Sequence, residues 1–187
     1  MSALVKTAGV LLKSEGNISV GQKAVPEPVE NKQYLTFKLS GEMFSIGILL
    51  IKEIIWYTDL TDVPMMPACI RGIINLRGSV VPVMDLSVRF GKPPTQVTKN
   101  TCIVIVEVYG AVNGQRKNMG IVVDAVQAVV EIASADIELE PTFGTTIQGD
   151  LIEGIAKVAD KFVILLNVHK VLSLEEIGQM SDIVQIQ

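Results

Sequence analysis

A repeated segment constrains the fold of this 187-residue chain more than any other feature. The segment from Gly72 to Leu86 consists of two apolar runs joined by Arg77-Gly78-Ser79. A short connection that contains glycine between two apolar runs is typical of a β-hairpin. The pattern returns without gaps 82 residues later, from Gly154 to Val168, with Ala159-Asp160-Lys161 at the tip. We therefore expect two copies of one β-rich unit.

Local signals add detail to the first hairpin. Pro82 cannot donate a backbone hydrogen bond, so we expect its strand to lie at a sheet edge or to carry a bulge there. Asp85 is predicted to be the N-cap of a short helix over residues 86–90, which Gly91 ends. A second similarity, between residues 47–50 and 120–123, supports the duplication. Many short strands with few helices favour a mainly β fold, in which two small barrels pack together.

Other segments show strand or helix patterns of their own. Residues 34–39 and 43–48 predict a hairpin, and the nearly uniform apolar run 101–108 predicts a strand covered on both faces. Residues 49–56 contain helix formers, with Lys52 and Glu53 opposite an apolar face, and predict a helix of one to two turns. Further strands are expected at 118–123, 136–140, 151–157 and 161–168, followed by a short helix that Ser173 and Glu176 would cap.

The first 32 residues differ in composition from the rest of the chain. Residues 14–31 are dominated by Ser, Gly, Lys, Glu and Pro, which is typical of a flexible linker. Before them, apolar residues from Leu4 to Leu12 follow a helical spacing, so a docking helix and a mobile tail both remain open.

Composition limits the class of protein. Runs such as 46–51 and 162–166 are far below the roughly 18 to 20 apolar residues that cross a bilayer, so no membrane insertion is expected. The N-terminus lacks a signal-peptide pattern, which favours the cytoplasm. With 16 basic residues against 20 acidic ones and no basic run, nucleic acid is not an expected partner.

Few residues could carry catalysis. His169 is the only histidine, which excludes a two-histidine metal site, and the glycine-rich phosphate and nucleophile motifs are absent from the sequence. Cys69 and Cys102 are expected to be buried free thiols. We predict no catalytic residue, no metal and no cofactor. A small β-barrel enzyme or ligand-binding protein that uses His169 stays as an alternative of a different class.

Recognition through a surface is therefore the favoured interpretation. Protein-binding sites expose apolar side chains among polar ones, a pattern found at Ile51-Lys52-Glu53 and at Asn75-Leu76-Arg77-Gly78. Core packing competes as an account of Ile51 and Leu76.

An ordered set of motifs gives the chain a resemblance to a known family. The motifs span residues 34–39, 44–54, 63–64, 70–78, 81–86, 120–126 and 152–168. Together, over about residues 33–180, the chain resembles the CheW coupling proteins of bacterial chemotaxis. Met65-Met66-Pro67 and the long N-terminal tail depart from the usual pattern. The two methionines would either fill the core or extend an adaptable binding patch.

The resemblance implies a fold and a function. It implies two SH3-like five-stranded β-barrels around a shared apolar interior, between a tail at 1–32 and a C-terminal tail at 181–187. The barrels would be built mainly from about 33–90 and 101–168, with some strand exchange possible. It further implies a non-enzymatic adaptor that joins the cytoplasmic tips of methyl-accepting chemoreceptors to the regulatory domain of the histidine kinase CheA, recruited to membrane-associated arrays.

The resemblance also assigns site residues. Ile51, Lys52, Glu53 and Arg77 are expected to contact receptors, and Asn75, Leu76, Arg77 and Gly78 to form the signature turn or a kinase contact. We hypothesise that Glu53 and Arg77 form an ion pair that holds the predicted helix against the hairpin tip. A CheW-like module of another kinase pathway, or a CheV-type coupler without its receiver domain, remains an alternative.

Overall fold

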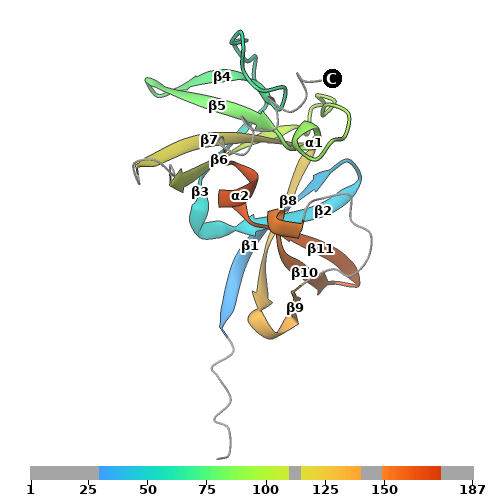
Figure 1. Ribbon diagram of the computed structural model, residues 1–187. Coiled ribbons are helices and arrows are strands. Elements are labelled where there is room, and N and C mark those ends of the chain that lie inside the picture. The colour runs from blue at the N-terminus through green and yellow to red at the C-terminus, as the bar shows by residue number, and fades with distance from the viewer. Residues whose placement is uncertain (1–29, 110–114, 140–148, 174–187) are drawn as a thin grey trace, which may run out of the picture.

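Two β-sheets form the body of the protein in the computed structural model, which describes residues 30–109, 115–139 and 149–173 (Figure 1). The six-stranded sheet has the order β8 (Ala125–Ala133), β1 (Asn31–Leu39), β2 (Glu42–Gly47), β11 (Lys161–Leu166), β10 (Ile152–Val158) and β9 (Ile137–Glu138). The five-stranded sheet has the order β3 (Ile51–Trp56), β6 (Cys102–Tyr109), β7 (Arg116–Val123), β5 (Ser79–Asp85) and β4 (Ile70–Leu76). The helices are short: η1 (Ile48–Leu50), α1 (Leu86–Arg89), η2 (Ser134–Asp136), η3 (Gly149–Leu151) and α2 (Val168–Val171).

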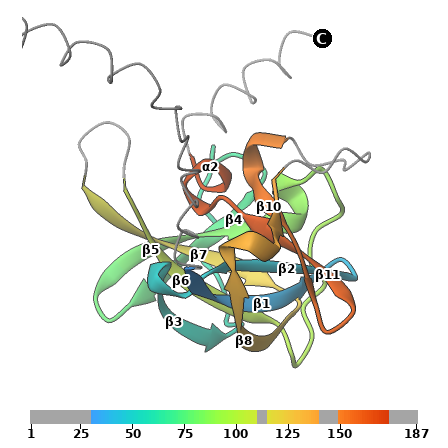
Figure 2. The same ribbon diagram turned by 90° about the horizontal axis from the view of Figure 1, so that it is seen from below.

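The mainly β fold is confirmed, but the sheets do not follow the chain in order. The hairpin of β1 and β2 joins the sheet of β8 to β11, and β6 and β7 join the sheet of β3 to β5. Figure 2 shows β1 beside β8, and β2 pairs with β11 in parallel. Each sheet therefore takes strands from both halves of the chain, and such an exchange of strands was left open in the expected division at about 33–90 and 101–168. The first strand also begins at Asn31, inside the tail expected over 1–32.

The duplication is visible in matching irregularities of the two hairpins. The β4–β5 register shifts between Ile70 and Gly72, and the β10–β11 register shifts between Ile152 and Gly154, 82 residues later. The strand pairing also corrects one part of the predicted repeat. Val83 pairs with Gly120, whereas its counterpart Leu165 pairs with Ser45, so Ser45 rather than Gly47 is the equivalent of Gly120.

Each of the two repeated hairpin segments begins with a glycine, because a neighbouring segment of the chain packs too closely there for a side chain. A Cβ on Gly72 would lie 2.7 Å from the backbone oxygen of Thr61. A Cβ on Gly154 would lie 2.5 Å from Ile137 Cγ2 and 2.8 Å from the backbone oxygen of Glu138. Each hairpin thus packs directly against an extended segment that precedes it, as the Thr61–Ile73 bridge and the β9–β10 pairing show.

The helix predicted over residues 49–56 is wrong. A single 3-10 turn, η1, ends at Leu50, and residues 51–56 form β3, which pairs with β6. Burial alternates along β3 between half-buried and exposed residues, as in a strand with one covered face. Its isoleucines suit a strand, and backbone pairing with a segment some 50 residues away overrides the helix formers.

Two other local predictions have mixed outcomes. Asp85 caps α1 by accepting a hydrogen bond from Ser87 N, and Gly91 follows the helix with φ 71°, as predicted. The edge position expected for the strand of Pro82 is wrong, because β5 lies between β7 and β4. The pairing of β5 with β7 begins at Val83, so Pro82 lies just outside it. The helix expected after Ser173 and the early apolar segment 4–12 lie outside the described residues.

The apolar residues form one large core between the sheets and a smaller cluster within each sheet. Phe37, Phe44 and Leu166 of one sheet meet Met84, Val104 and Ile121 of the other in the large core. The run Cys102 to Val106 is fully buried on both faces, as predicted. Cys69 and Cys102 are buried free thiols, as predicted. Met65 and Met66 lie at the surface rather than in the core.

Candidate functional site

The edge strand β3 presents a mixed surface of apolar and charged side chains. Ile54 is 41% exposed and Trp56, the only tryptophan of the chain, is 70% exposed, and both lie on one face of the strand, whereas Glu53 lies on the other. An edge strand has one unpaired backbone side, and natural proteins place charges on such strands to prevent unwanted pairing. Large exposed apolar side chains among charges are typical of a protein-binding surface.

The tip of the β4–β5 hairpin lies close to this strand. Leu76 pairs with Ser79, which leaves Arg77 and Gly78 as a two-residue turn, with φ 53° and 88°. Two positive φ angles in succession are typical of a type I′ turn. Gly78 N donates a hydrogen bond of 2.8 Å to Asn75 Oδ1. The turn therefore presents Arg77 in a fixed direction, and the Asn75 side chain stabilises the turn.

The predicted ion pair between strand and tip is present. Arg77 Nη2 donates to Glu53 Oε2 over 2.9 Å, with the arginine side chain 83% exposed and the glutamate side chain 24% exposed. The pair joins β3 to the turn between β4 and β5, rather than a helix to the hairpin tip. An exposed pair contributes about 0 to 1 kcal/mol to stability, so its main effect is on the shape and charge of the surface.

Ile51 and Leu76, for which core packing competed with a role in binding, are both half-buried. Ile51 packs against the large core, and Leu76 packs against the cluster within the five-stranded sheet. Ile54 and Trp56, which the sequence analysis left out of the site, are the better exposed apolar groups. We define the β3–hairpin surface as Lys52, Glu53, Ile54, Trp56 and Arg77.

A line of charges extends this surface along β6 and β7. Lys52 Nζ lies 3.0 Å from Glu107 Oε1, and Arg116 Nη1 lies 3.4 Å from Glu107 Oε2. Arg116 also covers the ring of Tyr109, 5.7 Å from its centroid. Lys52 was predicted as a receptor contact, but Glu107, Tyr109 and Arg116 were not, although Glu107 is the one charged residue in the apolar run 101–108.

His169 is the one residue that the alternative interpretation as an enzyme or ligand-binding protein would use. His169 lies in α2 with its ring 5.9 Å from that of Tyr109, in a tilted arrangement. Among the described residues, no group of three or more His, Cys, Asp or Glu side chains is placed to hold a metal ion. No helix in the described part of the chain is long and apolar enough to cross a bilayer.

Comparison with known proteins assigns the family. A family model described as the CheW-like domain matches residues 33–176. The chain belongs to the CheW-like family. The chemotaxis protein CheW of Klebsiella aerogenes is 32% identical over 152 residues, which cover 81% of this chain and 88% of that protein. CheW of Treponema pallidum is 27% identical over 163 residues, which cover 86% of this chain and 95% of that protein.

A solved structure supports the same assignment. The scaffolding protein TtCheW from Thermoanaerobacter tengcongensis is 37% identical and superposes with a TM-score of 0.67, over 77% of this chain and 89% of that one. The CheW-like match includes both β3 and the β4–β5 hairpin, so the candidate surface lies within the family domain.

Proposed function

We propose that this CheW-like protein is a non-enzymatic adaptor that couples methyl-accepting chemoreceptors to the histidine kinase CheA. The observation that carries the proposal is the edge strand β3, where Ile54 and Trp56 are exposed on one face and Glu53 pairs with Arg77 on the other. Exposed aromatic and arginine side chains are enriched at protein interfaces. The protein would act in the cytoplasm and be recruited to membrane-associated receptor arrays.

The receptor contact is assigned to β3 and the hairpin tip. Lys52, Glu53 and Arg77 would supply its charged groups, and the half-buried Ile51 would add apolar area at its border. Asn75, Leu76 and Gly78 would act through the turn, which fixes the direction of Arg77 and contributes to the kinase contact or to the signature geometry. Charges of both signs on β3 and the hairpin tip would fix the register of the receptor contact.

An adaptor with two interfaces acts by thermodynamic linkage. If receptor and kinase bind different surfaces of one molecule, the receptor changes kinase activity only through contacts that differ between the kinase states. Modest interfaces of micromolar affinity suit an array in which many weak contacts act together.

Titration of single partners tests the proposal. Trp56 lies in the proposed receptor contact, so its fluorescence should report binding of a receptor cytoplasmic fragment, while calorimetry measures binding of a CheA regulatory domain. We expect Arg77→Ala and Glu53→Ala each to weaken binding of at least one partner by about tenfold, as for a charged group at an interface. The control is Lys157→Ala, which removes the exposed Lys157–Asp160 pair of 3.2 Å on the equivalent second hairpin. Wild-type protein that binds neither matched partner would contradict the proposal.

A further inference from the structure

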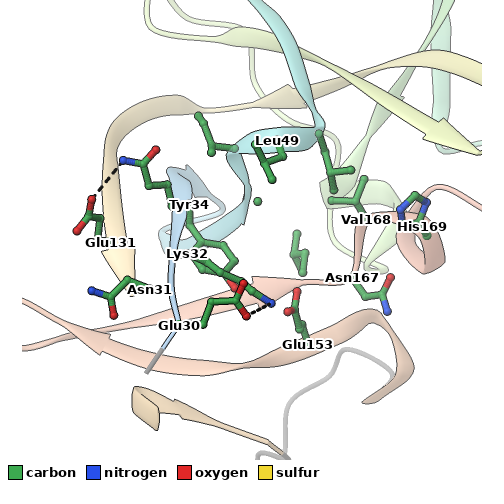
Figure 3. A pocket seen from close by; sticks show the side chains of 15 residues that line it. Glu30, Asn31, Lys32, Tyr34, Leu49, Glu131, Glu153, Asn167, Val168 and His169 are labelled. Atoms are coloured by element: carbon green, nitrogen blue, oxygen red, sulfur yellow. Dashed lines mark hydrogen bonds and ion pairs between the residues drawn. The ribbon is translucent and has the colours of Figure 1, made fainter. Parts of the chain in front are cut away.

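A cavity of about 650 Å³ lies apart from the β3–hairpin surface (Figure 3). The start of β1, the turn η1, strand β10 and the start of α2 surround it. Cavities that bind small ligands have volumes of about 300 to 1,000 Å³ and combine an apolar wall with a few polar groups. This cavity has that size, and its two sides differ in chemistry.

Tyr34 is the central polar group of one side. The residue is 3% exposed and lines the cavity, yet its hydroxyl has no hydrogen-bond partner among the described residues. Burial, and then the carboxylates of Glu153 and Glu30, raise the pKa of Tyr34. Figure 3 shows its side chain extending from β1 toward the side where these two carboxylates lie. The hydroxyl oxygen is therefore open to the cavity and available to a ligand that donates a hydrogen bond to it.

Negative charge predominates around this hydroxyl. Three carboxylates, of Glu30, Glu131 and Glu153, line the cavity against one ammonium group, that of Lys32. Lys32 Nζ lies 3.9 Å from Glu30, and Gln33 donates to Glu131 over 3.3 Å. Glu153 forms no ion pair or hydrogen bond with the described residues. The unpaired carboxylate and the unpaired hydroxyl therefore lie on the same side of the cavity.

The opposite side is aliphatic. Ile48, Leu49 and Leu50 of η1 and Val168 of α2 contribute to it. Leu49 is 96% exposed at the edge of the cavity, which leaves a large apolar side chain uncovered beside a polar group without a partner. An aliphatic chain laid on this wall would remove apolar surface from water.

We propose that this cavity binds a small organic cation with an aliphatic stem, such as a primary alkylamine in its ammonium form. An ammonium group has three donors and no acceptor, which suits the Tyr34 hydroxyl oxygen and the Glu153 carboxylate together. The stem covers Leu49 and the neighbouring wall. The site shares no residue with the β3–hairpin surface to which the receptor contact is assigned.

Titration of the full chain with hexylammonium, followed by ¹H–¹⁵N NMR, tests the site. Saturable shifts are expected at the amides of Gly47, Ile48, Leu49 and Val168, and hexanoate, with the same stem and the opposite charge, should produce none. Glu153→Gln should weaken binding about tenfold or more, since a hydrogen bond to a charged group is lost. Tyr34→Phe should weaken it about three- to tenfold while leaving the thermal midpoint unchanged, since the hydroxyl has no protein partner.

A gain of affinity separates the proposal from damage to the fold. Lys32→Met removes the competing ammonium of the cavity and should strengthen hexylammonium binding by about threefold, a result that misfolding cannot produce. Asp62→Asn, an exposed carboxylate outside the cavity, is the matched control and should change nothing.

Three results would overturn the proposal. They are equal binding of hexanoate, unchanged affinity in Glu153→Gln, or no saturable shift with the wild-type chain. A blocked lysine presents the same ammonium group on a peptide. If it bound more tightly than hexylammonium, the site would take the side chain of a partner protein, and the assignment to a free small cation would be wrong.

Discussion

Asp85 and Asn167 occupy equivalent positions after the two duplicated hairpins, and each accepts a backbone hydrogen bond that starts a four-residue helix. Asp85 Oδ1 accepts from Ser87 N over 3.0 Å, and Asn167 Oδ1 accepts from Lys170 N over 3.2 Å. The first cap has additional partners. Asp85 also accepts from Arg71 Nη1 and from both the backbone N and the hydroxyl of Thr95, at 2.9 to 3.0 Å, while it is buried.

This difference predicts unequal costs for the two caps. Asp85→Ala should lower the free energy of unfolding by about 3 to 5 kcal/mol, because Arg71 and Thr95 lose a buried partner. Asn167→Ala should cost about 0.5 to 2 kcal/mol, as for the loss of a helix cap. Urea denaturation of both variants measures the difference. Equal costs would show that the additional bonds of Asp85 do not contribute to stability.

The glycines of the hairpins allow a second pair of variants. Gly154→Ala should destabilise by about 1 to 3 kcal/mol, because its methyl group would overlap Ile137 and the backbone of Glu138. Gly47→Ala is the control, since nothing lies within 4 Å of its added Cβ and its φ is −59°. Its denaturation midpoint should be unchanged or slightly raised. A Gly154→Ala variant as stable as the wild type would contradict the packing of β9 on β10.

The tip of the second hairpin offers a stabilising change. Ala159 and Asp160 have φ 47° and 62°, a region that alanine rarely adopts and that aspartate adopts less readily than glycine. Replacing them together with Asn-Gly, the preferred type I′ pair, should raise the free energy of unfolding by about 1 kcal/mol. Thermal denaturation checks the result. A lower midpoint would mean that the turn is not of this type.

The buried thiols predict a dependence of stability on pH. Burial raises the pKa of Cys69 and of Cys102, so each thiol keeps its proton in the folded chain at a pH where the unfolded chain has lost it. Their contribution to stability is therefore complete below about pH 8.5, the usual thiol pKa, and declines as pH rises above it. Urea titrations between pH 7 and 10 should show this decline. It should become smaller in Cys69→Ala and Cys102→Ala, and an unchanged slope would contradict the account.

The features predicted correctly from the sequence are those that depend on residues close to one another in the chain. The hairpin at Arg77-Gly78 and the cap at Asp85 depend on a few adjacent residues, and both are present. Residues 51–56 were predicted as helix, because their identity as a strand depends on pairing with β6, which is distant in sequence. The strand β8 was not predicted, because its residues show no clear alternation between buried and exposed positions.

In the candidate site, too, some contacts could be predicted from local motifs and others depend on how distant strands pair. The Glu53–Arg77 pair was predictable from opposite charges in two motifs of one unit. The contacts of Glu107 with Lys52 and Arg116 were not, because they depend on which residues of β3, β6 and β7 lie across from one another. The exposure of Trp56 likewise depends on β3 being an edge strand with alternating faces.

Simultaneous binding of both partners tests the central claim most directly. Analytical ultracentrifugation of this protein with a receptor cytoplasmic fragment and a CheA regulatory domain would measure whether one complex contains all three chains. The adaptor account predicts a ternary complex that forms with wild-type protein and Lys157→Ala and is depleted in Arg77→Ala. If receptor fragment and kinase domain instead exclude one another from the protein, a single shared surface is present and the coupling account is wrong.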